Sequence, residues 1–116
     1  MFQKFINSFG YAYRGIRTVF LEERNFKIEA FIALVVSIFA YAFDFSPIEI
    51  LFCLVAITIV LLSEIINTAM EDLCTKVEPN HDHTIGKIKD IMAGFVLVSS
   101  VGALLIGVIV FYNHFL

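Results

Sequence analysis

The chain has 116 residues, of which 59% are hydrophobic and 16% charged, and its mean hydropathy is +0.88. This composition is too apolar for a soluble domain of that length, so it predicts an integral membrane protein with one domain covering residues 1–116. The formal net charge of −3 argues against a nucleic-acid partner, and two cysteines at no recognised spacing predict neither a zinc site nor a disulfide framework.

The first predicted element is a helix over residues 2–21 with an apolar stripe. Phenylalanine, isoleucine and tyrosine recur there at steps of three and four, and most basic and polar residues lie off that stripe. This pattern predicts an amphipathic helix lying on a membrane surface. A helix packed against its own bundle, without touching lipid headgroups, is an equally compatible interpretation.

Three apolar segments follow, and each is long enough to cross a bilayer, which requires about 20 residues or slightly fewer. The predicted spans are residues 26–43, 48–70 and 91–111. Residues 44–47 and 78–84 are the predicted turns, each containing a proline that breaks a helix. The expected fold is therefore an all-α integral membrane bundle of three transmembrane helices plus the N-terminal surface helix.

Seven of the eight basic residues lie before the first span or between the second and third spans, and the eighth, Lys27, is the second residue of the first span, at its N-terminal end. With three spans, these two regions share one side of the membrane, and the positive-inside rule makes that side cytoplasmic. We therefore expect a cytoplasmic N-terminus and a C-terminus outside. The connection between the second and third spans would then face the compartment that holds ATP and magnesium.

The second span ends in a polar segment, SEIINTAMED, residues 63–72. At about 100° per residue, Glu64, Asn67, Glu71 and Thr75 fall on one helix face, and the two carboxylates are about 10 Å apart along the axis. A carboxylate inside a membrane persists only where it faces a bundle interior or a wet cavity, so it is typical of a functional site. The alternative is that Glu64 and Asn67 join helices by hydrogen bonds.

Further acidic residues lie around the start of the first span. Glu22 and Glu23 precede it, and Glu29 lies among apolar neighbours in its first turns. Magnesium takes one or two carboxylates and completes its shell with water and phosphate oxygens, so Glu23 with Glu71 would suffice. A solvated acidic pair beside Arg24 explains Glu22 and Glu23 equally well.

The segment GKIKD, residues 86–90, opens the third span. Its two lysines project to different helix faces, and Lys89, adjacent to Asp90, is the one expected to turn toward the polar face. A lysine there would stabilise charge on transferring phosphate oxygens, and Asp90 would bind a nucleotide or fix the lysine. Positive-inside anchoring is the alternative and explains Lys87. The preceding HDH segment lacks further ligands at suitable spacing, which favours a solvated loop over a metal site.

These segments together resemble the prokaryotic diacylglycerol kinase and undecaprenol kinase family of small three-span membrane enzymes. The resemblance covers nearly the whole chain. It rests on EERNFKIEA, on EIINTAMED for the family's ExxNxxxE signature, and on KIKDIMAG, which carries KDxxAG. The ERNF and NTAME segments look more like the undecaprenol kinase branch.

The resemblance implies a homotrimer in the bacterial inner membrane that transfers the γ-phosphate of MgATP to the hydroxyl of a lipid alcohol. Undecaprenol is the favoured acceptor and diacylglycerol the other. By match to the family motif, Glu64 would be the catalytic base and would contact the lipid with Glu29 and Asn67. Glu23 and Glu71 would hold magnesium and, with it, the nucleotide.

The resemblance also implies nucleotide contacts from Lys89 and Asp90, from Tyr11 in GYAYRG, and, by a looser match, from Lys4. Thr75 departs from the family, which usually has an aspartate there. The family's loop histidine is also displaced, because an aspartate stands in its place between two histidines. Both departures concern the nucleotide side of the expected site.

A non-enzymatic membrane oligomer, such as a channel or an assembly factor, is the alternative function. Its acidic stripe would line a pore or join helices. A pore requires polar residues along its whole length, whereas the outer halves of these spans are apolar. We expect direct phosphoryl transfer, because no serine, cysteine or histidine is paired with a base for a covalent intermediate.

Overall fold

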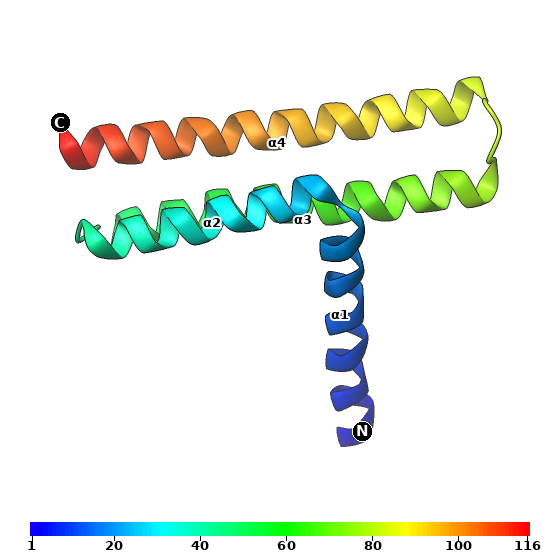
Figure 1. Cartoon of the computed structure of the whole chain (residues 1–116), viewed down its shortest axis with the longest axis horizontal. Helices are drawn as coiled ribbons and strands as arrows, with labels where there is room; N and C mark the ends of the chain where they lie inside the picture. Colours follow the sequence, from blue (N-terminus) through cyan, green and yellow to red (C-terminus); the bar gives the residue numbers. More distant parts are fainter.

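The computed structural model describes residues 1–116, and the chain is entirely helical (Figure 1). Its helices are α1 (Phe2–Glu22), α2 (Arg24–Ala42), α3 (Pro47–Val77) and α4 (His83–Phe115). Helix α3 contacts both α2 and α4, and α1 points away from these three helices, across their common direction (Figure 1). The all-α fold predicted from the sequence is confirmed.

Helices α2, α3 and α4 are each long and apolar enough to cross a membrane. Only 12 of the 116 residues are buried within the chain, and large apolar side chains such as Leu97 and Val98 are mostly exposed. Such a surface is suited to lipid rather than to water, and helices satisfy their own backbone hydrogen bonds inside a bilayer. The chain is therefore a multi-pass membrane protein.

The connection between α3 and α4 is shorter than the turn expected over residues 78–84, because His83 and Thr84 belong to α4. The reason is local: the Asp82 side chain accepts a hydrogen bond from the backbone N–H of Ile85 at 3.0 Å and so caps the helix. Helix α3 also continues past residue 70 to Val77. The α3–α4 hairpin consequently extends beyond the level at which α1 joins the bundle (Figure 1).

The turn between α2 and α3 reverses the chain within a few residues. Asp44 adopts a left-handed conformation with φ of 53°, which a short polar residue tolerates better than most. The N–H of Phe45 donates to the carbonyl of Ala40 at 3.0 Å, and the N–H of Asp44 donates to that of Tyr41 at 3.4 Å. This pair of bonds is a Schellman ending, which satisfies the last carbonyls of α2.

Glu49 links two helices at this same end of the bundle. It forms a capping box with Ser46, whose N–H donates to Glu49 Oε1 at 2.8 Å, with Pro47 at the first helical position. His114 Nδ1, near the end of α4, donates to Glu49 Oε1 at 3.0 Å and lies 3.2 Å from Oε2. Glu49 is only 7% exposed. We call this contact between Glu49 and His114 the clasp; the sequence analysis did not predict it.

An aromatic cluster surrounds the clasp. The Phe45 ring lies 4.4 Å from the His114 ring, measured between centroids, and 5.3 Å from the Phe111 ring. The Phe39 ring stacks on Phe111 with centroids 5.2 Å apart. The small buried core also lies here and contains Ala40, Phe45, Cys53 and Val110. The buried apolar cluster of the chain thus lies at the end of the bundle opposite the α3–α4 turn.

A single extended residue, Glu23, separates α1 from α2. Its φ of −108° and ψ of 111° end one helix and begin the next. Phe20 and Phe26 meet edge to face across this corner with centroids 6.4 Å apart, and Val19 and Phe26 are buried there. The rest of α1 is largely exposed and points away from the three spans (Figure 1). Contact of α1 with lipid headgroups stays a prediction.

The clasp should contribute to stability through the specific pairing of its two side chains. We expect Glu49→Ala and His114→Ala each to lower the thermal unfolding midpoint, because each change leaves a poorly solvated polar partner without its hydrogen bond. The double variant should lose less than the sum of the two single losses. The unfolding midpoints of the two single variants and the double variant are measured by circular dichroism of the helical signal during heating in detergent. Ser46→Ala is the control, because it removes the capping box but leaves Glu49 and His114 in place. Strictly additive losses would contradict the pairing.

Candidate active site

The centre of the candidate site is Glu64, which is buried at 2% exposure on the inner face of α3. Its neighbours Ser63 and Thr68 are equally buried, but their hydroxyls are used within their own helix. Ser63 Oγ donates to the carbonyl of Val60 at 2.8 Å, and Thr68 Oγ1 donates to the carbonyl of Glu64 at 2.9 Å. Glu64 Oε2 therefore has no hydrogen-bond partner.

Glu29, on α2, is the second carboxylate in this region. It is partly buried, and its Oε2 is also without a hydrogen-bond partner. Glu64 is close enough for its charge to act on Glu29. Buried acceptors are rarely left unpaired in native proteins, and each one is unfavourable by about 1–3 kcal/mol. Two such oxygens on facing helices therefore indicate a place where a hydrogen-bond donor binds.

Neither Glu64 nor Asn67 makes a hydrogen bond to another helix of the chain. The only side-chain hydrogen bonds between helices in the structure are those of the clasp, at the opposite end of the bundle. The alternative that Glu64 and Asn67 join helices thus has no support within one chain. Asn67 is partly buried on the same helix face as Glu64.

Glu23 and Glu71 form the rim of the site. Glu23 lies at the corner between α1 and α2, and Glu71 is exposed on α3. The charges of both act on Glu64, so the three carboxylates are neighbours. Burial, followed by the charges of Glu71, Asp72 and Glu22, raises the pKa of Glu23 above its ordinary value. The rim is therefore a place of unrelieved negative charge.

These carboxylates fit a divalent cation. The one ion pair within salt-bridge distance in the structure is the clasp, so no lysine or arginine neutralises the rim. No group of three or more histidine, cysteine, aspartate or glutamate side chains is arranged to hold a metal by itself. Oxygen ligands from Glu23 and Glu71 alone suit a hard ion that takes its remaining ligands from water and phosphate.

Lys89 and Asp90 reach the level of the rim from α4. Glu71 lies six residues before the end of α3, and Asp90 lies seven residues after the start of α4. Both are therefore about 10 Å along their helices from the turn that joins α3 to α4. Both α4 residues are exposed. Lys89 and Asp90 therefore lie at the same end of the bundle as the acidic residues, as the sequence predicts.

A polar pocket of about 610 Å³ lies at the start of α4. Its lining includes Lys87 and Asp90 together with all of the HDH segment, but not Lys89. The sequence alone favours a solvated loop for the HDH segment, whereas in the structure His83 already belongs to α4. The sequence feature that could have predicted this shared lining is Asp82, which caps the helix. A helix that starts at His83 places residues 83, 87 and 90 on one face at helical spacing.

Lys4 and Tyr11 are not brought to the other site residues within this chain. Both are exposed on α1, and about 28 Å and 18 Å of helix separate them from Glu23. The Tyr11 ring instead receives the guanidinium of Arg14 at 5.1 Å from its centroid. Their predicted nucleotide contacts stay predictions.

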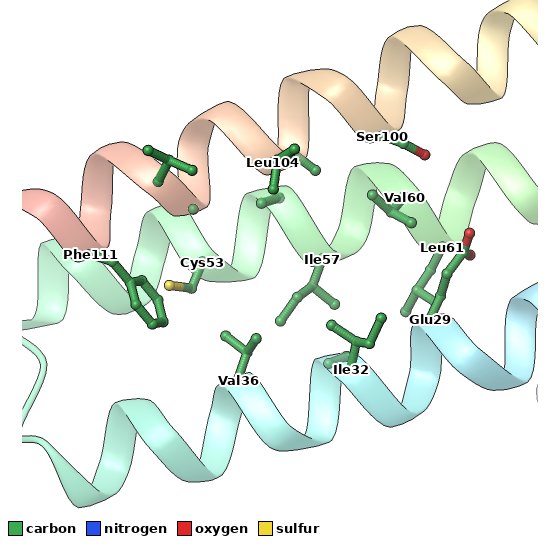
Figure 2. Close-up of a pocket in the computed structure, with 15 residues that line it drawn as sticks. Glu29, Ile32, Val36, Cys53, Ile57, Val60, Leu61, Ser100, Leu104 and Phe111 are labelled. Atoms are coloured by element: carbon green, nitrogen blue, oxygen red, sulfur yellow. The ribbon is translucent and has the colours of Figure 1, made fainter.

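An apolar cavity of about 490 Å³ extends from the site into the bundle between α2, α3 and α4. Figure 2 shows Glu29 at one end of the cavity and Phe111 with Cys53 at the other. Ser100 is the only other polar side chain in its lining besides the Cys53 thiol and Glu29. The unpartnered Glu29 carboxylate thus adjoins a space suited to hydrocarbon.

The fold and the site define a small multi-pass membrane protein with an acidic site at one end of its bundle, beside an apolar cavity. The model of the family described as prokaryotic diacylglycerol kinase matches residues 10–111. The chain belongs to this family, and it is an ATP-dependent lipid kinase; kinases of this type use a divalent metal.

Three relatives illustrate the similarity. The chain is 25% identical over 114 residues to the diacylglycerol kinase of Escherichia coli (strain K12), covering 98% of this chain and 93% of the relative. It is 32% identical over 108 residues to the undecaprenol kinase of Bacillus subtilis (strain 168), covering 93% and 88%. It is 31% identical over 101 residues to the diacylglycerol kinase of Synechocystis sp. (strain ATCC 27184 / PCC 6803 / Kazusa), covering 86% and 58%.

The crowded rim should oppose folding when no cation is present. Because the pKa of Glu23 is raised, the folded protein keeps this proton to a higher pH than the unfolded chain, and stability falls as the pH rises above 4.5. Glu71→Gln, which removes one neighbouring charge, should raise the unfolding midpoint at about pH 8 and change little at about pH 4.

Thermal melts in detergent with a chelator measure this difference. Asp44→Asn, which removes a charge from the distant α2–α3 turn, is the matched control and should leave the midpoint unchanged at either pH. If Glu71→Gln were destabilising at the higher pH, mutual repulsion among these carboxylates would be the wrong explanation.

Proposed function

We propose that the protein transfers the γ-phosphate of ATP directly to the hydroxyl of a membrane lipid alcohol, with undecaprenol favoured over diacylglycerol. The observation that carries the proposal is the pair of unpartnered carboxylate oxygens on Glu64 and Glu29, of which Glu29 lines one end of an apolar cavity. A lipid alcohol matches both features, because its hydroxyl donates a hydrogen bond while its chain occupies apolar space.

Glu64 is the proposed catalytic base. Its unpartnered oxygen is free to accept the hydrogen bond of the lipid hydroxyl and then its proton, while Asn67 and Glu29 orient the lipid. Thr68 and Ser63 do not compete for this oxygen, since their hydroxyls are bound to backbone carbonyls. Glu64 is therefore free to accept the proton as the hydroxyl oxygen attacks phosphorus.

Glu23 and Glu71 are the proposed ligands of magnesium, which when bound neutralises charge on the β- and γ-phosphate oxygens. The two residues come from different elements, a corner and a helix, so they hold the nucleotide's phosphates at a fixed height above Glu64. Lys89 and Asp90 contact the nucleotide in this proposal. The adjoining polar pocket with Lys87 offers further phosphate-binding groups.

The proposed assembly is a homotrimer in the bacterial inner membrane, with a cytoplasmic N-terminus and the C-terminus outside. The distribution of basic residues supports this orientation. The distance of Lys4 and Tyr11 from the acidic site of their own chain supports an assembly in which α1 also serves a neighbouring copy. Helix α1 would then lie along the cytoplasmic membrane surface.

Undecaprenol is the favoured acceptor because ERNF and NTAME resemble that branch of the family. The 32% identity to the Bacillus subtilis undecaprenol kinase agrees with this preference. The expected outcome is that purified protein given ATP, magnesium and equal amounts of undecaprenol and diacylglycerol labels undecaprenol with the higher kcat/KM. Equal or reversed labelling would contradict the choice of acceptor but not the lipid kinase activity.

The carboxylate roles are tested by radiolabelled ATP, magnesium and a panel of lipid alcohols. Glu64→Gln should lower kcat by about 10²–10⁴-fold, because the general base is lost. Glu71→Gln should also abolish labelling, and this loss should be partly relieved by excess magnesium. Asp44→Asn should keep full activity. If the unaltered protein labels no alcohol, or if Glu64→Gln turns over at the normal rate, the proposed function is wrong.

A further inference from the structure

The apolar cavity between α2, α3 and α4 has two unlike ends (Figure 2). Phe111 lies at one end, where its ring stacks on Phe39 and meets Phe45 edge to face, so a packed aromatic cluster backs this end. Glu29 lies at the other end, and its Oε2 is shielded from solvent without a hydrogen-bond partner. The cavity therefore combines a place for one hydrogen-bond donor with a long apolar space.

Helix α4 lines this cavity with small residues. Ser100, Ala103 and Gly107 recur on one helix face at steps of three and four. Small residues at such spacing usually allow two helices to approach closely. Gly107 does not serve that purpose, because a side-chain carbon added there would meet no atom of another helix within 4 Å. The missing side chain of Gly107 thus leaves space in the cavity rather than a close helix contact.

A helix of a neighbouring copy is one alternative occupant, since an apolar groove also suits packing between subunits. The exposed faces of the three spans, however, carry mostly large apolar side chains, which donate no hydrogen bond to Glu29. The acyl tail of an ordinary membrane lipid brings no donor either. A lipid alcohol with its hydroxyl at Glu29 and its chain directed toward Phe111 matches both ends of the cavity.

We propose that Gly107 is a specificity-determining residue, whose missing side chain admits the part of the acceptor's hydrocarbon chain that follows the hydroxyl. This inference rests on the proposed function, because it concerns how the proposed lipid alcohol is held. Figure 2 shows Ser100 toward the Glu29 end of the cavity, and Gly107 lies about 10 Å farther along α4. Gly107 therefore acts only on chains long enough to reach it.

The test is kcat/KM for a series of isoprenoid alcohols, from the single-unit alcohol prenol to undecaprenol, with ATP and magnesium. Gly107→Leu fills the cavity. The ratio of kcat/KM for undecaprenol to that for the shortest alcohol that the unaltered protein phosphorylates should fall on the order of 10-fold, the usual scale of discrimination by an apolar pocket. Gly102→Leu makes the same change about 140° around α4. Residue 102 lies outside the cavity lining and also has open space around it, so this variant should keep the ratio of the unaltered protein.

Ala103→Leu, four residues away on the same face, is the second filling variant if Gly107→Leu does not fold. A photoreactive undecaprenol analogue, with its reactive group in the chain near the hydroxyl, gives a second readout and should crosslink to the cavity lining of the unaltered protein. An unchanged ratio in the filling variants, a uniform loss at every chain length, or crosslinks only outside the lining overturns the inference.

The size of the detergent-solubilised assembly distinguishes the other occupant. A smaller assembly in Gly107→Leu than in Gly102→Leu would assign the cavity to a neighbouring copy and overturn the inference, whereas an unchanged size is the expected result. Failure of the unaltered protein to phosphorylate any alcohol would instead overturn the proposed function.

Discussion

The exclusion of unpaired polar groups from lipid is the constraint on which the rest of this structure depends. Helix α3 carries two buried glutamates, Glu49 in its first turn and Glu64 near its middle, and their hydrogen bonding differs. Glu49 is fully partnered, by the cap it forms with Ser46 and by His114. Glu64 keeps an oxygen without a partner. The same residue type on the same helix is therefore satisfied in the first turn and left with an unpaired oxygen near the middle, which is typical of a functional site.

The corner at Glu23 joins the geometry of the fold to that of the site. One extended residue turns the chain from α1 into α2 and puts its own side chain next to Glu71. Phe20 and Phe26 pack across this corner, so the position of the rim carboxylate is set by apolar contacts rather than by a loop. A lipid kinase needs this precision, because ATP arrives from water and the alcohol from the bilayer, and the reacting atoms must meet at one height.

The fold was largely predictable from the sequence, and the site only in part. Long apolar runs with turn residues between them have one solution in a bilayer, so the helices followed directly. The placement of Glu64 and Glu71 on one helix, α3, followed from the sequence, whereas their depth in the membrane stays a prediction. The clasp could not be predicted, because Glu49 and His114 are 65 residues apart and meet only through the packing of α3 on α4. Similarly, the face shared by Lys87 and Asp90 depended on where Asp82 begins α4.

The two ends of the bundle also differ in how much stability they contribute. The clasp and the aromatic cluster around Phe45 hold the ends of α3 and α4 together, whereas the rim accumulates carboxylates that repel one another. A site of this kind is completed only when a cation and phosphate arrive, since they alone relieve the repulsion around Glu23. In the proposed site, binding of the nucleotide with its metal would therefore do more than deliver a phosphoryl group. It would also hold the corner between α1 and α2 against α3, near the orphaned oxygen of Glu64, as phosphoryl transfer to a lipid hydroxyl requires.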